Sequence, residues 1–209
     1  MTSVAPNTSL VYRLIKRTAD IVISLSGLVI LSPLFIVIAA AVASEREGGV
    51  IFRQTRAGWK NRPFTMYKFR TMVKNAAALR DEMERFNELD GPAFKMKNDP
   101  RVTKAGRFLR RTSLDELPQL YNVLKGDMSL VGPRPLPTYE SEKCNEEQLQ
   151  RLLVKPGITC YWQVCGRNDI SFNEWMEMDL RYIKEQSLRT DAVILLQTVK
   201  AVLSGRGAY

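Results

Sequence analysis

The sequence predicts an α+β protein that is mostly helical, with an N-terminal membrane helix followed by a small cytosolic domain that contains a short β-hairpin. Three observations predict this class. Residues 21–43 carry no charged side chain, two strand-like segments flank a turn at residues 57–63, and helical patterns dominate the remainder, including the last third from Ser171. We therefore expect an N-terminal segment at residues 1–48 and a cytosolic domain at residues 49–209.

The uncharged stretch of 23 residues is long enough to cross a bilayer, but Ser32-Pro33 lies in its middle. Proline at that position breaks or kinks a helix. Basic residues occur on both sides of the stretch, and the positive-inside rule keeps both ends cytoplasmic. A re-entrant helix bent at Ser32-Pro33 meets both demands, while a kinked span remains the alternative. The Ser32 hydroxyl is expected to help satisfy the backbone near the bend.

The next elements are a hairpin and a set of helices. Residues 50–54 and 64–70 form the two predicted strands, and alternation places Lys68 and Arg70 on the face opposite to Tyr67 and Phe69. Helices are predicted at residues 75–89, 103–111 and 117–124, and Gly126 is expected to end the last of these.

Composition narrows the chemistry. The net charge is +9, which suits an anionic partner such as nucleic acid, nucleotide phosphates or an anionic membrane surface. The chain contains no histidine, so Ser-His-Asp triads and histidine-ligated zinc are excluded. No P-loop motif is present. The three cysteines show no disulfide-like spacing and are typical of a reducing compartment.

The Asp115-Glu116 pair is the strongest candidate for catalysis. One interpretation is structural, because Ser113 with Glu116 fits a capping box and Asp115 as N-cap places Pro118 in the first turn. In either register the carboxylates lie at the positive end of a helix, which favours their ionised forms. An ionised aspartate is a competent nucleophile, and a neighbouring carboxylate can help hold a divalent metal.

Basic residues accumulate around this pair. Arg110 shares a predicted helix face with Arg107 and Arg111, Lys68 and Arg70 form another basic pair, and two more arginines, Arg134 and Arg167, lie in loops marked by Pro and Gly. Arginine forks match phosphate oxygens in a bidentate manner. The combination with a membrane segment indicates a polyphosphate substrate near lipid.

Long motifs of this sequence resemble the bacterial sugar transferases, which are monotopic polyprenyl-phosphate phosphoglycosyl transferases. The resemblance extends over nearly the whole chain and is carried by residues 67–72, 99–120, 122–135, 155–159 and 162–167, with Lys16-Arg17, Asp20 and residues 32–35 matching the membrane entry. Cys160-Tyr161 and Cys165 depart from the usual family pattern, and we expect them to affect packing or sugar preference.

The resemblance implies a specific reaction. The membrane helix would be re-entrant, broken at Ser32 and Pro33, and residues 49–209 would be the catalytic domain in a minimal form of the enzyme. Asp115 would attack a UDP-sugar and form a phosphosugar-aspartyl intermediate with release of UMP. Glu116 would support Mg²⁺ and proton handling, so both carboxylates are candidate metal ligands. Arg110 and Arg167 match phosphate-contacting positions, and Asp179 matches a further acidic position.

The implied partners are a UDP-sugar, polyprenyl (undecaprenyl) phosphate and the inner-membrane bilayer, with the protein on its cytoplasmic face; a homodimer is left open. Residues 204–209 resemble the ending of hexose-1-phosphate transferases of exopolysaccharide or O-antigen assembly, and this resemblance implies UDP-galactose or UDP-glucose as the donor. Nucleic acid is not an expected partner. A nucleic-acid-binding protein would need a basic stripe with aromatic stacking positions and no acidic pair, and a non-enzymatic scaffold would not need Asp115.

Overall fold

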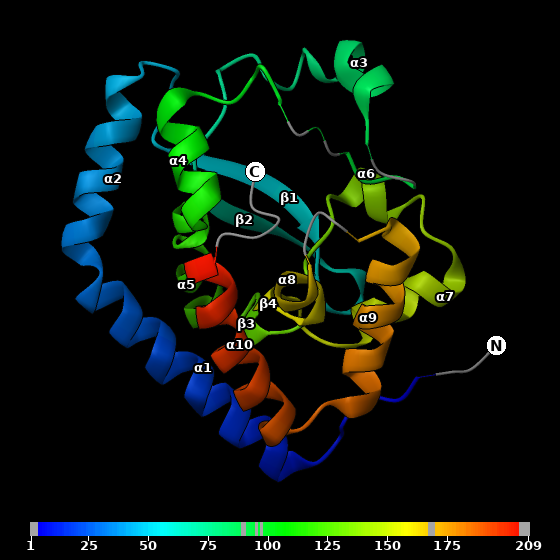
Figure 1. The fold of residues 1–209 in the computed structure, drawn as a ribbon. Helices are drawn as coiled ribbons and strands as arrows, with labels where there is room; N and C mark the ends of the chain where they lie inside the picture. Colours follow the sequence, from blue (N-terminus) through cyan, green and yellow to red (C-terminus); the bar gives the residue numbers. More distant parts are fainter. Residues whose placement is uncertain (1–3, 89–90, 95, 97, 167–169, 205–209) are drawn as a thin grey trace.

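The computed structural model describes residues 4–88, 91–94, 96, 98–166 and 170–204 (Figure 1). It begins with two helices, α1 (Leu10–Ile30) and α2 (Ser32–Ser44), which meet at 62°. The pair runs along one side of the molecule, where α1 contacts α5 (Gln119–Lys125) and α2 contacts α4 (Lys104–Thr112) (Figure 1). No single described helix has both the length and the hydropathy of a membrane span, but the bent pair satisfies that test together.

The break between α1 and α2 lies at Ser32-Pro33, as predicted. The Ser32 hydroxyl donates a hydrogen bond to the carbonyl of Val29 at 2.8 Å, which satisfies one acceptor at the end of α1. Pro33 occupies the first turn of α2, where the missing N–H costs little. The predicted role of the Ser32 hydroxyl at the bend is therefore confirmed.

Polar side chains of α1 attach this helix to the rest of the protein. Lys16 forms an ion pair with Asp191 at 2.7 Å, and Arg17 donates to carbonyls at the end of α5. Asp20 is buried and accepts a hydrogen bond from the backbone N–H of Leu130 at 2.9 Å. Since buried polar groups are costly unless paired, these contacts fix the rotation and position of α1.

The predicted hairpin is confirmed. Strands β1 (Ile51–Ala57) and β2 (Pro63–Phe69) pair antiparallel, with Thr55 opposite Thr65, and a 3₁₀ segment, η1 (Trp59–Asn61), lies in the connecting turn. Phe69 packs on the α2 side chain Phe35, with ring centroids 5.4 Å apart. The hairpin is thereby connected to the bent helix pair on one face.

The prediction of a helix at residues 75–89 is largely wrong. Residues 74–79 form successive turns, and only α3 (Arg80–Met83) and a 3₁₀ segment, η2 (Glu84–Phe86), are helical; residue 89 lies outside the described part. Phe86, which the pattern placed on an apolar stripe, is 45% exposed. Short helices are marginal without tertiary packing, so favourable alanine propensity does not suffice here.

The next helices follow the prediction closely. Thr103 caps α4 (Lys104–Thr112) by accepting from the N–H of Gly106, and α5 (Gln119–Lys125) ends at Gly126 with φ of 96°. Between them lies the 3₁₀ segment η3 (Leu114–Glu116). The capping interpretation of this region is wrong in both registers, because α5 begins after Pro118 without a side-chain cap and Ser113 adopts φ of 57° instead of capping η3.

The remaining elements enclose the core. A parallel pair, β3 and β4, lies beside α5, and Tyr182 and Ile194 of the last two helices pack there with Val123 and Met128. A capping box formed by Ser171 and its third helical residue starts α9. The bounds are β3 Ser129–Val131, α6 Thr138–Ser141, α7 Glu146–Leu149, η4 Gln150–Leu153, β4 Gly157–Thr159, α8 Tyr161–Cys165, α9 Phe172–Glu185 and α10 Leu188–Ser204.

Candidate active site

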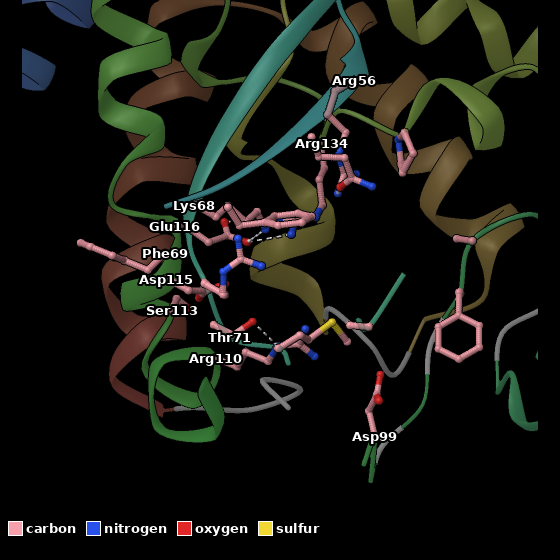
Figure 2. A pocket seen from close by; sticks show the side chains of 18 of the residues that line it. Arg56, Lys68, Phe69, Thr71, Asp99, Arg110, Ser113, Asp115, Glu116 and Arg134 are labelled. Carbon is pink, nitrogen blue, oxygen red and sulfur yellow. Dashed lines mark hydrogen bonds and ion pairs between the residues drawn. The ribbon is translucent and has the colours of Figure 1, made fainter. Parts of the chain in front are cut away.

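One cavity of about 880 Å³ gathers most of the residues singled out above. Its walls come from the hairpin, η3, the loop after β3, α8 and α9. Figure 2 shows the carboxylates of η3 and the hairpin lysine facing the arginines across this space. The cavity is therefore assembled from segments far apart in sequence, and η3 is the segment that brings both carboxylates to it.

Glu116 is the centre of an ion-pair network. Its Oε1 accepts from Lys68 Nζ at 2.9 Å and from Arg134 Nη2 at 2.7 Å, and its Oε2 accepts from Arg134 Nη1 at 3.2 Å. Burial opposes ionisation of Glu116, but Arg134 and Lys68 outweigh it and hold the pKa of this carboxyl well below its ordinary value. Glu116 is thus a permanent anion that orients two cations.

Asp115, the adjacent residue, has a different environment. Its side chain is buried and lines the cavity. Among the described residues, no hydrogen bond or ion pair engages its carboxylate. Burial raises the pKa of Asp115 above its ordinary value, while the charges of Lys68 and Arg110 act in the opposite direction. A buried carboxylate that faces a cavity and is not occupied by a partner retains the reactivity that a nucleophile needs.

Two further predicted residues lie at the cavity wall. Arg110 is the only one of the three α4 arginines to line it, and its Nε donates to the Thr71 hydroxyl at 3.1 Å (Figure 2). Desolvation lowers the pKa of Arg110, and the charge of Asp115 counteracts this. Arg70 also lines the cavity and donates to the Gly49 carbonyl at 2.7 Å.

Charge around the cavity is strongly unbalanced. Among the described residues that line it, eight carry a positive charge and four carry a carboxylate. Asp99 and Arg101 are buried and form an ion pair, with Arg101 Nη2 2.7 Å from Asp99 Oδ2, so together they add no net charge. The remaining excess favours an anionic ligand with several phosphate oxygens.

An aromatic wall borders the arginines. Trp162 and Trp175 stack with ring centroids 4.7 Å apart, and the Arg134 guanidinium lies 5.5 Å from the centroid of Trp162. Arginine over an aromatic face is held in place without losing its hydrogen-bonding edge. The tryptophans therefore restrict the orientation of the same guanidinium that binds Glu116.

Asp179 lies behind the cavity instead of in its wall. It is fully buried, and its Oδ2 accepts from Arg151 Nη2 at 2.6 Å and Nε at 2.9 Å. The same Arg151 Nη2 donates to the backbone carbonyl of Arg134 at 2.5 Å. Burial raises the pKa of Asp179 to about 6 despite the attraction of Arg151. A direct contact of Asp179 with substrate stays a prediction that this placement does not support.

The structure adds residues that the sequence did not single out. Arg56 on β1, the Asp99–Arg101 pair and Trp175 all line the cavity. Asp99 and Arg101 lie inside a motif already noted, whereas Arg56 lies in none of those motifs. Arg167, expected to contact phosphate, lies outside the described residues and stays a prediction.

A preformed magnesium site made of Asp115 and Glu116 does not fit this geometry. Both oxygens of Glu116 are engaged by cations, which leaves one carboxylate of the pair open. The described residues also contain no group of three or more metal-ligating side chains. Mg²⁺ is commonly held by one or two carboxylates together with substrate phosphates. The protein alone would supply too few ligands.

Comparison with known proteins identifies the family. Residues 11–205 match the family described as bacterial sugar transferase. The chain is 47% identical over 195 residues to galactosyl transferase CpsE of Streptococcus agalactiae and 46% identical over 202 residues to undecaprenyl-phosphate galactose phosphotransferase of Salmonella typhimurium. It is 39% identical over 198 residues to exopolysaccharide production protein ExoY of Rhizobium meliloti.

These alignments cover 92%, 94% and 93% of this chain, respectively. The chain spans less than half of the first two relatives, 43% and 42% of their lengths, but 88% of the third. The matched residues include all of α1 except Leu10, and they include the carboxylate pair. The chain belongs to the bacterial sugar transferase family.

Proposed function

We propose that this protein transfers a sugar-1-phosphate from a UDP-sugar to polyprenyl phosphate and releases UMP. The observation that carries the proposal is that the two neighbouring carboxylates of η3 have different environments. Both oxygens of Glu116 are engaged by Lys68 and Arg134, while Asp115 faces the same cationic cavity without a partner among the described residues. A paired carboxylate beside an unpaired one is suited to phosphoryl transfer, which needs positioning and charge neutralisation.

The reaction has two displacement steps in this proposal. An Asp115 carboxylate oxygen attacks the sugar-bearing phosphorus, the bond from that phosphorus to the bridging oxygen breaks, and UMP leaves with the bond's electron pair. A phosphosugar-aspartyl intermediate remains. A phosphate oxygen of the polyprenyl phosphate then attacks the same phosphorus and displaces the aspartate, which gives polyprenyl-diphosphate-sugar. No oxidant or reductant is required.

The cationic residues stabilise the charge that moves during these steps. Arg110 and Lys68 lie close enough to Asp115 to influence its ionisation, so they also lie near the phosphorus that it would attack. Arg134 lines the cavity, and its guanidinium lies against the Trp162 ring. Pre-oriented charges of this kind stabilise a developing oxyanion without reorganisation. We assign no step to Mg²⁺, which we propose enters with the diphosphate.

The lipid acceptor requires access from a membrane. We propose that α1 and α2 enter the cytoplasmic leaflet of the bacterial inner membrane and return, so that the protein is monotopic. The Ser32-Pro33 break supports this, as do the exposed apolar side chains on both helices, among them Val29, Ile30 and Ile36. Leu117, Leu120 and Val202 give part of the cavity wall an apolar character suited to a prenyl chain.

The names of the relatives guide the choice of donor. Two of them are named for galactose transfer and one for exopolysaccharide production. We propose UDP-galactose or UDP-glucose as the donor in exopolysaccharide or related glycoconjugate synthesis.

Release of UMP tests this function. Purified full-length protein is incubated with magnesium, undecaprenyl phosphate and each of a panel of UDP-sugars. We expect lipid-dependent UMP release with one hexose donor and none with Asp115→Asn. A protein that releases no UMP with any donor, yet binds RNA or DNA at physiological ionic strength, would support the nucleic-acid alternative instead.

A further inference from the structure

Arg56 is a buried cation of the cavity wall with an unusual set of partners. Its Nη1 donates to the carbonyl of Pro135 at 2.8 Å, and its Nη2 donates to Gln54 Oε1 at 2.6 Å. Both partners are neutral. Among the described residues, Arg56 forms no ion pair, and its Nε–H, which is buried, has no hydrogen-bond partner.

A guanidinium in this setting is costly unless an anion compensates it. Desolvation, together with the neighbouring charge of Arg134, lowers the pKa of Arg56 to about 10. Glu140 opposes this shift from beyond ion-pair distance. A buried charge without a counter-charge destabilises a protein, and a ligand that supplies the counter-charge removes that cost.

The strand that carries Arg56 directs it into the cavity. Alternation along β1 places Phe52, Gln54 and Arg56 in the cavity wall, while Arg53 lies on the other face and rests against the Tyr67 ring. Figure 2 shows Arg56 next to Arg134 and separated from Arg110 by the carboxylate pair. Arg56 and Arg134 therefore provide a second cationic group, apart from the one formed by Arg110.

We propose that Arg56 binds a phosphate group of the substrate through its free Nε–H edge, together with Arg134, and that it thereby fixes the diphosphate relative to Asp115. This role rests on the proposed function. The phosphate is that of the nucleotide donor or that of the lipid acceptor, since both present the same oxyanion. The Pro135 and Gln54 contacts hold the guanidinium in place before the ligand arrives.

The decisive comparison uses Arg56→Lys and Arg53→Lys, the same substitution three residues apart on one strand. Lysine retains the charge but loses the planar fork. We expect Arg56→Lys to weaken binding of inorganic pyrophosphate, measured by calorimetry, at least tenfold, and Arg53→Lys to leave it unchanged. Arg56→Gln should weaken it more. Thermal unfolding without ligand identifies any variant that has lost its fold.

Turnover then separates the two phosphate sources. If the Arg56 variants raise the KM for the UDP-sugar alone, the contact is with the donor. If they raise the KM for undecaprenyl phosphate alone, the contact is with the acceptor. Either result supports phosphate binding. Folded Arg56→Lys and Arg56→Gln variants with wild-type pyrophosphate affinity and both KM values unchanged would overturn it. Because pyrophosphate binding needs no turnover, failure of the proposed reaction would show separately as absent activity in the wild type.

Discussion

Arg134 engages both carboxylate oxygens of Glu116, at 2.7 Å and 3.2 Å, across 17 intervening residues. Lys68 joins the same carboxylate from the hairpin. Asp115 receives no such contact from any described residue, although it is the adjacent residue in the chain. Their environments therefore drive the pKa values of the two carboxyls in opposite directions, down for Glu116 and up for Asp115. Such a separation is typical of sites in which neighbouring acids have different roles.

Glu116→Gln should impair catalysis by releasing Lys68 and Arg134 from their fixed positions. The amide keeps the size of the side chain but loses the charge, so two partly buried cations lose their counter-charge. We expect the free energy of unfolding to fall by about 1–3 kcal/mol, measured by urea denaturation. The value of kcat should fall strongly. The affinity for Mg²⁺, measured by calorimetry, should stay as in the wild type.

A double-mutant cycle with Lys68→Met provides the control. If Glu116 acts through Lys68, the two substitutions should be less than additive in their effect on stability. Full additivity, together with loss of metal binding in Glu116→Gln alone, would indicate that Glu116 is a metal ligand and that the ion-pair network is secondary.

The pH dependence of kcat/KM should report on Asp115. The nucleophile must be ionised, and its raised pKa means that activity is present at higher pH and is lost as pH falls through that raised value. The acid limb should therefore lie above the ordinary aspartate pKa of about 3.9. Lys68→Met removes a charge that lowers the pKa of Asp115, so the limb should move to still higher pH. A limb that does not move in this variant would contradict the assignment.

Magnesium should be required for turnover but should not bind strongly to the protein alone. Both Glu116 oxygens already accept from Lys68 or Arg134, so a bound diphosphate must supply most of the ligands. We expect EDTA to abolish UMP release and excess Mg²⁺ to restore it. Calorimetry should detect tight Mg²⁺ binding only when UDP is present. Tight binding without nucleotide would show that the site is preformed.

Several features of this site could be predicted from the sequence. The helix break followed from Ser32-Pro33, the end of α5 from Gly126, and the carboxylate pair from its chemistry and its basic surroundings. The ion pair between Glu116 and Arg134 could not be predicted, because it depends on how the loop after β3 folds back over η3. Arg56 carried no local signal either, since only the register of β1 directs it into the cavity.

The wrong predictions have a common cause. Ser113-Asp115-Glu116 has the composition of a helix cap, and residues 75–89 have the composition of a helix, but neither segment's composition determines its tertiary contacts. The left-handed conformation of Ser113 instead turns the chain so that Asp115 becomes buried against the cavity. Tertiary contacts override the local helix propensity in the segment that forms the site, and functional sites are where such conflicts are expected.

The segment before α1 and the hairpin turn should both be accessible from the cytoplasmic side only. Cysteines are placed at Thr8, before α1, and at Arg62, in the hairpin turn, in a Cys165→Ser background that removes the one exposed native thiol among the described residues. A membrane-impermeant maleimide should label both positions in inside-out vesicles and neither in right-side-out vesicles. Labelling of position 8 from the outside would mean that the bent pair spans the membrane.

The nucleophile is tested most directly by Asp115→Asn. Asparagine has nearly the same shape, and no hydrogen bond of a described residue to the Asp115 side chain would be lost, so the variant should fold with a thermal midpoint close to that of the wild type. Burial of a carboxylate disfavours its charged form, so we expect the neutral amide to be accommodated at neutral pH without loss of stability. Turnover should nevertheless be abolished, because an amide is a very poor nucleophile towards phosphorus.

Mass spectrometry separates covalent from direct transfer. Wild-type protein mixed with magnesium and the active UDP-sugar, without lipid, should gain a phosphohexose adduct on the peptide containing Asp115. Asp115→Asn should show none, and Glu116→Gln should form the adduct slowly, because its nucleophile is intact but Lys68 and Arg134 are displaced. An active wild-type enzyme that never forms the adduct, and whose kinetics require both substrates bound together, would establish direct transfer. In that case the unpaired state of Asp115 would have to serve the acceptor phosphate instead of the donor.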